Sequence, residues 1–535
     1  MRIPTSGLSP LSKALIQIKG IDATKFLNGL ITSRLLPNVV KKKEHTISTV
    51  KKHEYLAETI DINTNWGLIH EDIYDPDNNI LVRRDGINSM ILNSKGRVVN
   101  DCFLYSEPFH NELQEQTNNA NKLEDSNYLL EIESKLARKL LTILKLHKLS
   151  SKVKIKQQSL FSYYYYNDTL EFDQWLEDLQ DKYFQSLNPS DALKSSNMFM
   201  NDEVLFNKSI ANHVVGFAID NRIPNFGIKF LLNKPIRGEE KEIEEKGINS
   251  PKNSETGLDI NSEIGSDINS EISILPYIPI DDLFSSLFKS QFAITPTPPE
   301  TIQRRRYING LFETQDAPED FSLLPFECNL DYTNGLSLEK GCYVGQELTI
   351  RTFNNGIIRK RLVPVQFFKL NQENIAQFEN QEVIELNPKD EIVHELRMIN
   401  QSSVTKLNIT PLVEEIEDVA GNSSPFMVNG SEDKGPFTAT GSVTSPFSSN
   451  SSDSPKSDTS NSPFSSPFGT KSTRKRKTSS GKLLSINDNL GFLLVNLSDI
   501  EKQTLFKLEL PALGEGGVKE IGVKVFQPDW WPQDS

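Results

Sequence analysis

Apolar positions near the start of the chain alternate as in a strand and then repeat at helical spacing. Residues 14–20, ALIQIKG, alternate apolar and polar positions and lead into a turn at Gly20. The following residues, to Leu36, place Phe26 and Leu27 on one face of an amphipathic helix. We therefore expect a folded start of the chain, with a strand followed by a helix.

The next segments extend this pattern. Residues 90–105, MILNSKGRVVNDCFLY, read as an apolar run, an Asn-Ser-Lys-Gly turn and a second strand, which is typical of a hairpin. A strand is expected at 128–132, a helix at 134–149 and a short strand at 153–155. Strand, helix, paired strands, helix and strand predict an α+β fold rather than a doubly wound sheet.

The rest of the folded part is richer in strands. Residues 348–351 read as a strand, and residues 483–495 and 521–526 predict a small β domain at the end of the chain. The predicted division is an α+β region at 1–235, a low-complexity acidic insertion at 236–274, a second part of the core at 275–370, the start of a β domain at 371–420, a disordered Ser/Pro-rich insertion at 421–480, and the remainder of the β domain at 481–535.

The insertions have compositions that cannot repay the entropy of ordering by burial. Residues 259–264 are echoed at 267–272, a repeat too short for a solenoid. A smaller polar tract runs over 111–127, and Ser-Pro-Phe recurs within 421–480. The basic run at 471–477 is read either as a nuclear-import or anion-binding patch or, as we favour, as a solvated loop.

Composition narrows the function classes. Only 37% of the 535 residues are hydrophobic, consistent with an incompletely packed chain. The net charge of −14 argues against a general nucleic-acid binder, and no apolar run reaches the length of a membrane span. We therefore expect neither nucleic-acid binding nor membrane insertion.

Three cysteines are too few for a disulfide framework and suggest a reducing compartment. The chain has no CxxC, and its seven histidines show no ligand spacing, so it cannot hold a conventional four-cysteine cluster alone. A cluster shared with another chain remains possible. The start of the chain has no acidic residue before Asp22 and carries Arg2, Lys13 and Lys19, a weak composition for a mitochondrial transit peptide.

One cysteine stands in unusual surroundings, in the run LEKGCYVGQE at 338–347. Gly341 and Gly345 on either side of Cys342 permit backbone conformations closed to other residues. Lys340 would favour the thiolate, which attacks, binds metal or carries sulfur. Spacing alone favours the alternative of an inert thiol in a tight turn, because most free cysteines are buried and unreactive.

This run resembles the KGCYxGQE signature of the YgfZ-type family, relatives of the glycine-cleavage T-protein that include mitochondrial iron–sulfur cluster assembly factors. In that family the motif cysteine is the functional residue. Asn221 stands where the family often has proline, and Lys229 where it often has arginine. The resemblance covers most of residues 11–235, 275–370 and 481–527, with matching blocks at 15–33, 92–105, 220–227, 306–310, 324–327, 347–351 and 356–362.

The resemblance implies a T-protein-like, aminomethyltransferase-type fold, with ferredoxin-like α/β domains around a central cavity, a small C-terminal β-barrel domain and disordered insertions. It also implies tetrahydrofolate binding in that cavity, with Asp101 as a contact and Arg97 for the glutamate tail. Asn100 replaces one member of the family's acidic pair, and an amide cannot act as a carboxylate base. The alternative for Asp101 and Arg97 is a structural role in the hairpin.

Three functions follow from the resemblance. The first, which we favour, is an assembly factor of the mitochondrial matrix without conventional turnover, in which Cys342 transiently binds iron or a cluster and Lys340 tunes the thiol. Its partners would be A-type carriers and apo four-iron enzymes such as aconitase and the lipoate and biotin synthases. The alternatives are a tetrahydrofolate-dependent aminomethyltransferase-like enzyme and an interaction scaffold. The signature loop around Cys342 comprises Gly341, Tyr343, Gly345, Gln346, Glu347 and Arg351. Cys102 and Cys328 are expected to be buried thiols.

Overall fold

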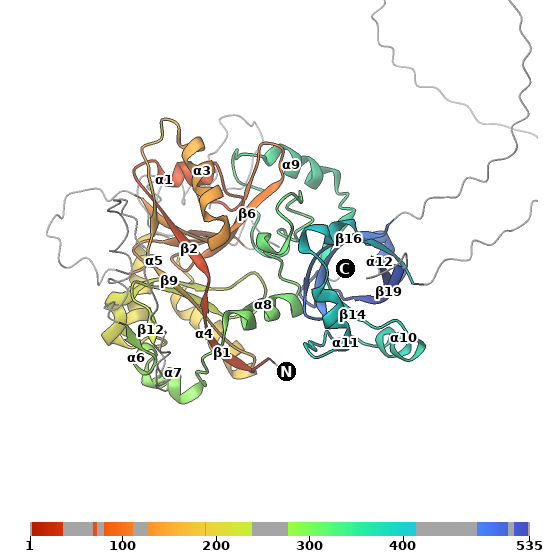
Figure 1. Ribbon diagram of the computed structural model, residues 1–535. Coiled ribbons are helices and arrows are strands. Elements are labelled where there is room, and N and C mark those ends of the chain that lie inside the picture. The colour runs from red at the N-terminus through yellow and green to blue at the C-terminus, as the bar shows by residue number, and fades with distance from the viewer. Residues whose placement is uncertain are drawn as a thin grey trace, which may run out of the picture. The chain divides into compact units, whose positions relative to one another are not determined.

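The computed structural model describes residues 3–35, 68–71, 80–110, 126–187, 189–237, 277–412, 479–511 and 518–532 (Figure 1). The expected polar tract at 111–127, both insertions and the basic run at 471–477 lie outside these ranges, apart from residues at their ends. Among the described helices, none is long and apolar enough to cross a membrane.

A five-stranded antiparallel sheet carries the first part of the chain. The predicted hairpin forms its β5 and β6, and the order of strands is β5-β6-β7-β2-β8. Strands β2, β6, β7 and β8 with helices α1 and α3 follow the β-α-β-β-α-β order of a ferredoxin-like unit. These elements, all predicted from the sequence, are β2 (Lys13–Lys19), α1 (Ala23–Asn28), β5 (Ile87–Leu92), β6 (Val98–Ser106), β7 (Asn127–Glu133), α3 (Ala137–Lys148, after a 3-10 turn at Ser134–Leu136) and β8 (Lys154–Gln158).

Helices α1 and α3 cover one face of this sheet because their apolar stripes need burial. Phe26 and Leu27 of α1 and Leu140 and Leu144 of α3 pack on the apolar face of the sheet, where Ile16 is fully buried. Figure 1 shows both helices on the same side of β2.

A second sheet has four antiparallel strands in the order β1-β9-β11-β10. Helices α4 to α7 pack against it through an aromatic-rich core. Its elements are β1 (Ser6–Leu11), β9 (Phe161–Asn167), α4 (Leu170–Tyr183), α5 (Pro189–Asn201), a 3-10 segment (Lys208–His213), β10 (Val214–Ile219), β11 (Ile228–Leu232), α6 (Ile280–Leu283) and α7 (Ser286–Gln291). The two sheets meet through apolar side chains that include Leu15 and Tyr105 of the first and Leu231 of the second.

The C-terminal residues form a six-stranded antiparallel sheet in the order β15-β18-β19-β14-β17-β16. Ser480 N donates to Ile409 O at 2.9 Å, so the two edges approach each other and the sheet curls into a half-barrel. The expected C-terminal β domain is therefore present. Its elements are β14 (Lys360–Phe368), α10 (Gln372–Glu379), α11 (Glu391–Arg397), a 3-10 segment (Gln401–Lys406), β15 (Asn408–Pro411), β16 (Gly481–Asn487), β17 (Leu490–Asn496), α12 (Leu497–Ile500), β18 (Leu505–Pro511) and β19 (Val518–Val525).

The remaining elements connect these sheets. They are the paired β3 (Leu68–Glu71) and β4 (Ile80–Arg83), the paired β12 (Ile236–Arg237) and β13 (Ile278–Pro279), α8 (Pro299–Ile308), a 3-10 turn (Thr314–Asp316) and α9 (Gln346–Asn355).

The strand expected at 348–351 is wrong, because these residues lie inside helix α9. The helix begins after Gly345 and ends at Gly356, both with positive φ (81° and 62°). Glu347 and Arg351 lie one turn apart and pair at 2.7 Å, an arrangement possible in a helix and not in a strand. The β-branched residues that suggested a strand express only a weak local preference, which the caps and tertiary contacts override.

A buried ion network around Glu313 joins the two sheets and α8. The carboxylate accepts from Lys13 of β2 at 2.9 Å and from Arg222, which follows β10, at 2.8 Å. Arg306 of α8 lies 3.5 Å from it. Arg222 also makes a two-pronged pair with Asp220. These side chains are at most a tenth exposed, so each charge depends on its partners for the solvation it has lost.

Replacing Glu313 with Gln is expected to lower the free energy of unfolding by about 3–5 kcal/mol, because three cations lose their shared anion inside the protein. Denaturant unfolding measures this, and Glu373→Gln on the exposed face of α10 is the matched control, expected to change stability by less than about 0.5 kcal/mol. Equal stability of the two variants would contradict the importance of the network.

The same residue predicts a pH dependence. Burial alone would raise the pKa of Glu313, but Arg306, Lys13 and Arg222 hold it well below the ordinary carboxyl range. Its stabilising contribution is therefore complete above the pKa of an unfolded glutamate and is lost as the pH falls towards the folded value. Acid titrations of unfolding should show a smaller loss of stability in Glu313→Gln than in the unmodified chain.

Candidate functional site

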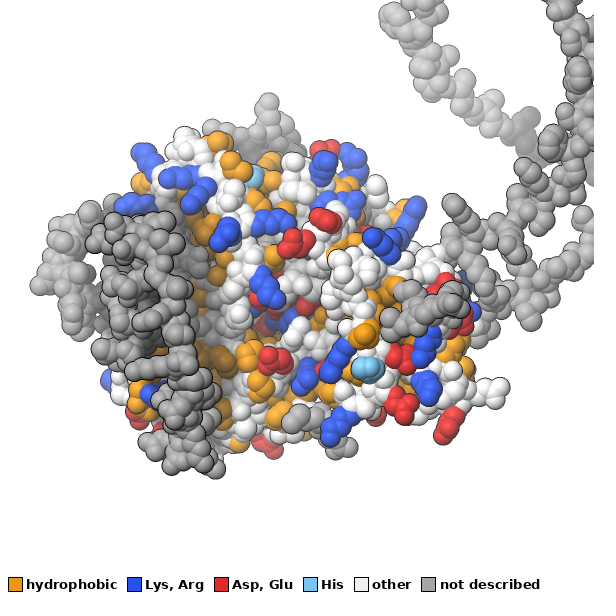
Figure 2. Space-filling view, in the orientation of Figure 1, with side chains coloured by type: hydrophobic (Ala, Val, Ile, Leu, Met, Phe, Trp, Pro, Cys, Tyr) orange, Lys and Arg blue, Asp and Glu red, His pale blue; other side chains and the backbone are white. Residues whose placement is uncertain are grey.

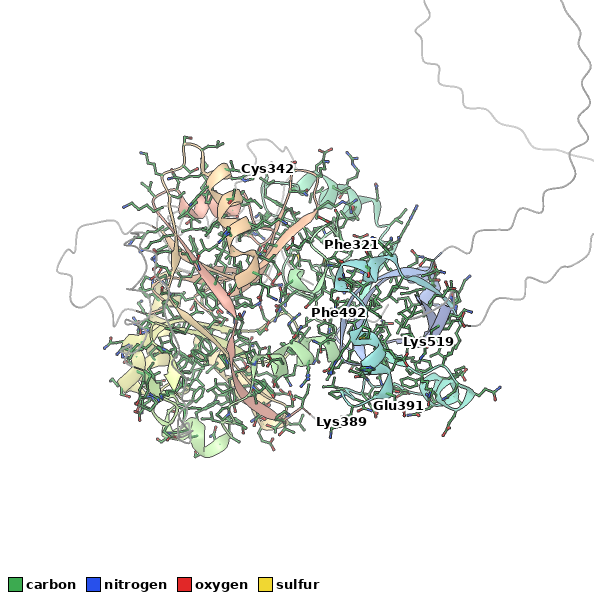
Figure 3. All side chains as sticks on the ribbon, in the orientation of Figure 1. Phe321, Cys342, Lys389, Glu391, Phe492 and Lys519 are labelled. Carbon is green, nitrogen blue, oxygen red and sulfur yellow. The ribbon has the colours of Figure 1, made fainter. Side chains whose placement is uncertain are left out.

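The Cys342 side chain is exposed, at the end of the loop that leads into α9 (Figure 3). It borders an open surface hollow of about 600 Å³ that runs along this helix, with Gln346, Ile350 and Asn354 among its lining. Cys102 and Cys328 are buried, as expected, and burial raises the pKa of both thiols. Cys342 is thus the thiol that a solute or partner can reach directly.

The Lys340 side chain anchors this loop to the end of α1. Its ammonium donates to the backbone oxygens of Asn28 (2.8 Å), Ile31 (2.6 Å) and Ser33 (2.9 Å). Carbonyls at the C-terminal end of a helix have no partner within the helix and carry partial negative charge, so a cation there is favourable. The ring of Tyr343 lies under the same ammonium, 4.7 Å from it.

Two effects oppose each other at Lys340. Burial lowers the pKa of its amine to about 7. The three carbonyl acceptors favour the ammonium form, because a neutral amine has only two hydrogens to donate. The side chain therefore holds the loop through these carbonyls, and its effect on the Cys342 thiol stays a prediction.

Gly345 is required by close backbone packing. Its φ is 81°, and a Cβ there would lie 2.3 Å from the oxygen of Asn93. Gly96, in the turn of the predicted hairpin, has φ 72°, and its Cβ would meet the oxygen of Gly345 at 2.8 Å. The hairpin turn and the signature loop therefore touch backbone to backbone, which only glycine allows.

Gly341 differs from Gly345. Its φ is not in the left-handed region, and a Cβ there would meet nothing within 4 Å. Gly341 therefore makes no use of the conformational freedom that glycine permits. What glycine provides at this position is an open approach to the backbone beside Cys342.

The rest of the loop is closed by paired hydrogen bonds. Tyr343 N donates to the Gln346 side-chain oxygen at 2.8 Å, and Gln346 N donates to Tyr343 O at 3.3 Å. Val344 N donates to Gly29 O at 3.0 Å, a second tie to the end of α1. By contrast, Glu347 and Arg351 pair on the exposed face of α9, where an ion pair contributes only about 0.3–0.5 kcal/mol.

The hairpin residues expected to contact folate have structural partners. Thr314 N donates to Asp101 Oδ1 at 2.7 Å, and Asp101 N donates to Thr314 Oγ1 at 2.8 Å. The Asn100 amide is buried and donates to Asp101 O. The Arg97 guanidinium lies 4.0 Å from Glu327. These contacts match the alternative of a structural role in the hairpin.

The space beside Asp101 also limits what it can hold. A cavity of about 20 Å³ lies there, lined by Arg222, Phe312, Glu313 and Trp530 among others. Such a volume accommodates about one water molecule. A pteridine ring does not fit, so we assign no step to a folate.

The sequence did not reveal the partners that position the loop. The carbonyls of Asn28, Ile31 and Ser33 belong to the backbone, and no residue type signals them. The sequence pointed to this segment only through the block at 15–33, which resembles the family. The contacts of Lys340 with residues 28, 31 and 33 give a physical reason for that resemblance. Among the described residues, no group of three or more His, Cys, Asp and Glu side chains could hold a metal ion.

Comparison with known proteins identifies the class. The chain is 52% identical over 537 residues to a Debaryomyces hansenii protein named "Iron-sulfur cluster assembly factor IBA57 homolog, mitochondrial", covering all of both chains. A Candida albicans protein of the same name is 52% identical over 99% of this chain and all of its own. The Saccharomyces cerevisiae iron–sulfur cluster assembly factor IBA57 is 29% identical over 66% of each chain.

The chain therefore belongs to the family of IBA57 mitochondrial iron–sulfur cluster assembly factors. This confirms the family branch that the signature suggested. No family model matches the chain. The solved aminomethyltransferase T of the glycine cleavage system from Bartonella henselae matches 98% of this chain and 86% of its own at 9% identity, but its TM-score of 0.42 is too low to support an argument.

The exposure of the cysteines predicts their reactivity. In the folded protein, a thiol reagent such as Ellman's reagent should modify Cys342 quickly and the buried Cys102 and Cys328 only as the chain opens. Cys342→Ser should remove the fast phase and leave the slow one. A fast phase that survives this substitution would show that a buried thiol is accessible.

Replacing Lys340 with Met should loosen the loop, because three carbonyls lose a charged donor. We expect a loss of roughly 2 kcal/mol or more in unfolding free energy and faster amide exchange at residues 341–346. Lys389→Met, at an exposed lysine, is the control. Unchanged exchange in the loop would contradict the anchoring role.

Proposed function

We propose that this chain assists iron–sulfur cluster assembly by binding iron or a cluster transiently at Cys342. The observation that carries this proposal is an exposed thiol on a loop whose backbone is fixed at Lys340 and Gly345. An inert structural cysteine needs neither exposure nor such support. Binding requires the thiolate, so the thiol proton leaves to solvent as the metal–sulfur bond forms.

The remaining ligands must come from elsewhere. Cys102 and Cys328 are buried, which leaves Cys342 to supply one sulfur, whereas a cluster usually needs four ligands. A partner that already carries iron or a cluster on its own thiolates would complete the set. The shared site would then lie at the interface between the two proteins, and the cargo would pass through it.

The surroundings of Cys342 suit such an approach. The open side at Gly341 admits a partner backbone close to the thiol. Beyond Cys342, the hollow along α9 offers Gln346, Ile350 and Asn354 as contacts. A-type carriers and apo four-iron enzymes are the partners we propose on either side of the transfer.

The setting is the mitochondrial matrix, a proposal supported by the word "mitochondrial" in the names of the relatives. The aconitase and the lipoate and biotin synthase types of enzyme are the recipients that we propose. The proposed scheme assigns no step to tetrahydrofolate, since the cavity beside Asp101 has a volume of about 20 Å³.

Aconitase activity in mitochondria from cells that lack the protein tests the proposal. The unmodified chain should restore activity, whereas Cys342→Ser at matched protein levels should lower it to near that of the deletion. Cys102→Ala is the matched control, since it changes a thiol that solvent does not reach, and it should rescue if it folds. Circular dichroism melting of each variant separates loss of function from loss of fold.

Equal rescue by Cys342→Ser and the unmodified chain would make this cysteine a packing residue. Absence of any aconitase defect in the deletion would overturn the proposed function as a whole.

A further inference from the structure

A strongly basic surface surrounds helix α3, in a chain whose net charge is −14. Between residues 134 and 167 the sequence has eight lysines and arginines and no aspartate or glutamate. We call this surface the basic face. It consists of Lys25, Lys135, Arg138, Lys139, Lys145, Lys148 and Lys152, which are exposed except for the half-buried Lys148. Figure 2 shows Lys and Arg side chains gathered over the region that holds α1 and α3.

Within the described residues, none of the seven cations of the basic face forms an ion pair with a carboxylate. On the other side of the neighbouring sheet edge, Lys19 of β2 stands directly opposite Lys154 of β8, and like charges at such positions destabilise a sheet. Asp22, a carboxylate at this face, is engaged by the backbone N–H of Lys152 at 2.6 Å. The fold thus tolerates a repulsion that a neutral surface would avoid.

Large apolar side chains stand among these cations. Leu149 is 87% exposed, Leu146 68% and Ile21 45%. Leu149 ends α3 with a φ of 41°, a left-handed conformation that normally selects glycine at this position. A leucine there bears both backbone strain and exposure to water, and neither the core nor the helix cap benefits from it.

We propose that the basic face binds an anionic lipid surface, with Leu146 and Leu149 entering the boundary between headgroups and acyl chains. Lysines around exposed leucines are the combination that interfacial binding uses, because the cations meet headgroup phosphates and the apolar side chains are buried among lipid. A nucleic acid would use the charges, but it offers leucine side chains little to bury against, and the basic face exposes no Phe, Tyr or Trp ring for stacking among its described residues.

Peripheral attachment at the basic face depends neither on Cys342 nor on cluster transfer, and it requires no membrane-spanning helix. Attachment at the basic face would hold the protein at an anionic membrane surface while the chain remains outside the hydrocarbon core.

Flotation of the full chain with vesicles tests the proposal. Phosphatidylcholine vesicles that contain about a fifth cardiolipin should bind the protein, and so should vesicles in which phosphatidylserine supplies the same total charge. Vesicles of pure phosphatidylcholine should not bind it. Binding to both anionic mixtures would indicate charge recognition, and binding to cardiolipin alone a headgroup preference; either result supports attachment. Absence of binding to both would overturn it.

Charge variants locate the surface. Lys139→Glu, Lys145→Glu and Lys152→Glu together should weaken binding by at least about tenfold. The matched control changes three exposed lysines outside the basic face, Lys389, Lys406 and Lys482, to glutamate and should bind nearly as the unmodified chain does. Equal losses in both triples would show attraction by total charge rather than by this face.

Substitution of an exposed leucine distinguishes a role in lipid binding from a role in the stability of the fold. Leu149→Gly should weaken vesicle binding by about tenfold while leaving the melting temperature unchanged or higher, because glycine accepts the positive φ. Leu170→Ser, at a leucine that is 82% exposed on α4, is the apolar control. Unaltered vesicle binding by Leu149→Gly would overturn the lipid proposal. The proposal would also fail if poly(U) RNA displaced the protein from vesicles and Leu149→Gly left RNA binding unchanged.

Discussion

The carboxylate of Glu313 is the interaction on which the arrangement of the α+β region depends. It is shared by a lysine from one sheet, an arginine that follows a strand of the other, and an arginine of α8. Apolar packing between the sheets is non-directional, whereas these charges are satisfied in one relative position only. The network therefore fixes how the strand β2, the segment after β10 and the helix α8 lie against one another.

Much of the fold could be predicted because its elements carry local signals. The turn at residues 93–96 is bounded by alternating apolar runs, and α3 shows a clear apolar stripe, so hairpin and helix were both found. Helix α9 was missed, because Leu348 to Arg351 has β-branched residues and its start is set by Gly345, whose φ follows from contact with the hairpin. That contact is tertiary and leaves no periodic pattern in the sequence.

In the candidate site, too, the residues of a local motif could be predicted and the contacts between distant segments could not. Cys342 was found from its motif, since a cysteine between glycines after a lysine is a recognisable combination, and its exposure agrees with a reactive role. The anchoring role of Lys340 was not foreseen, because its ammonium contacts the carbonyls of a segment far away in the sequence. Likewise, Asp101 is held by Thr314, 213 positions away, which spacing could not indicate.

The anchoring of Lys340 also has a meaning for the order of folding. Its three acceptors lie 307 to 312 positions earlier in the chain, so the contact closes one of the longest loops in the protein. Contacts of such long range form late, after the entropy of loop closure has been offset by the rest of the core. A chain whose folding is arrested before these distant segments meet would leave the Cys342 loop unanchored. Completion of folding thereby becomes a condition for presenting the thiol in its final position.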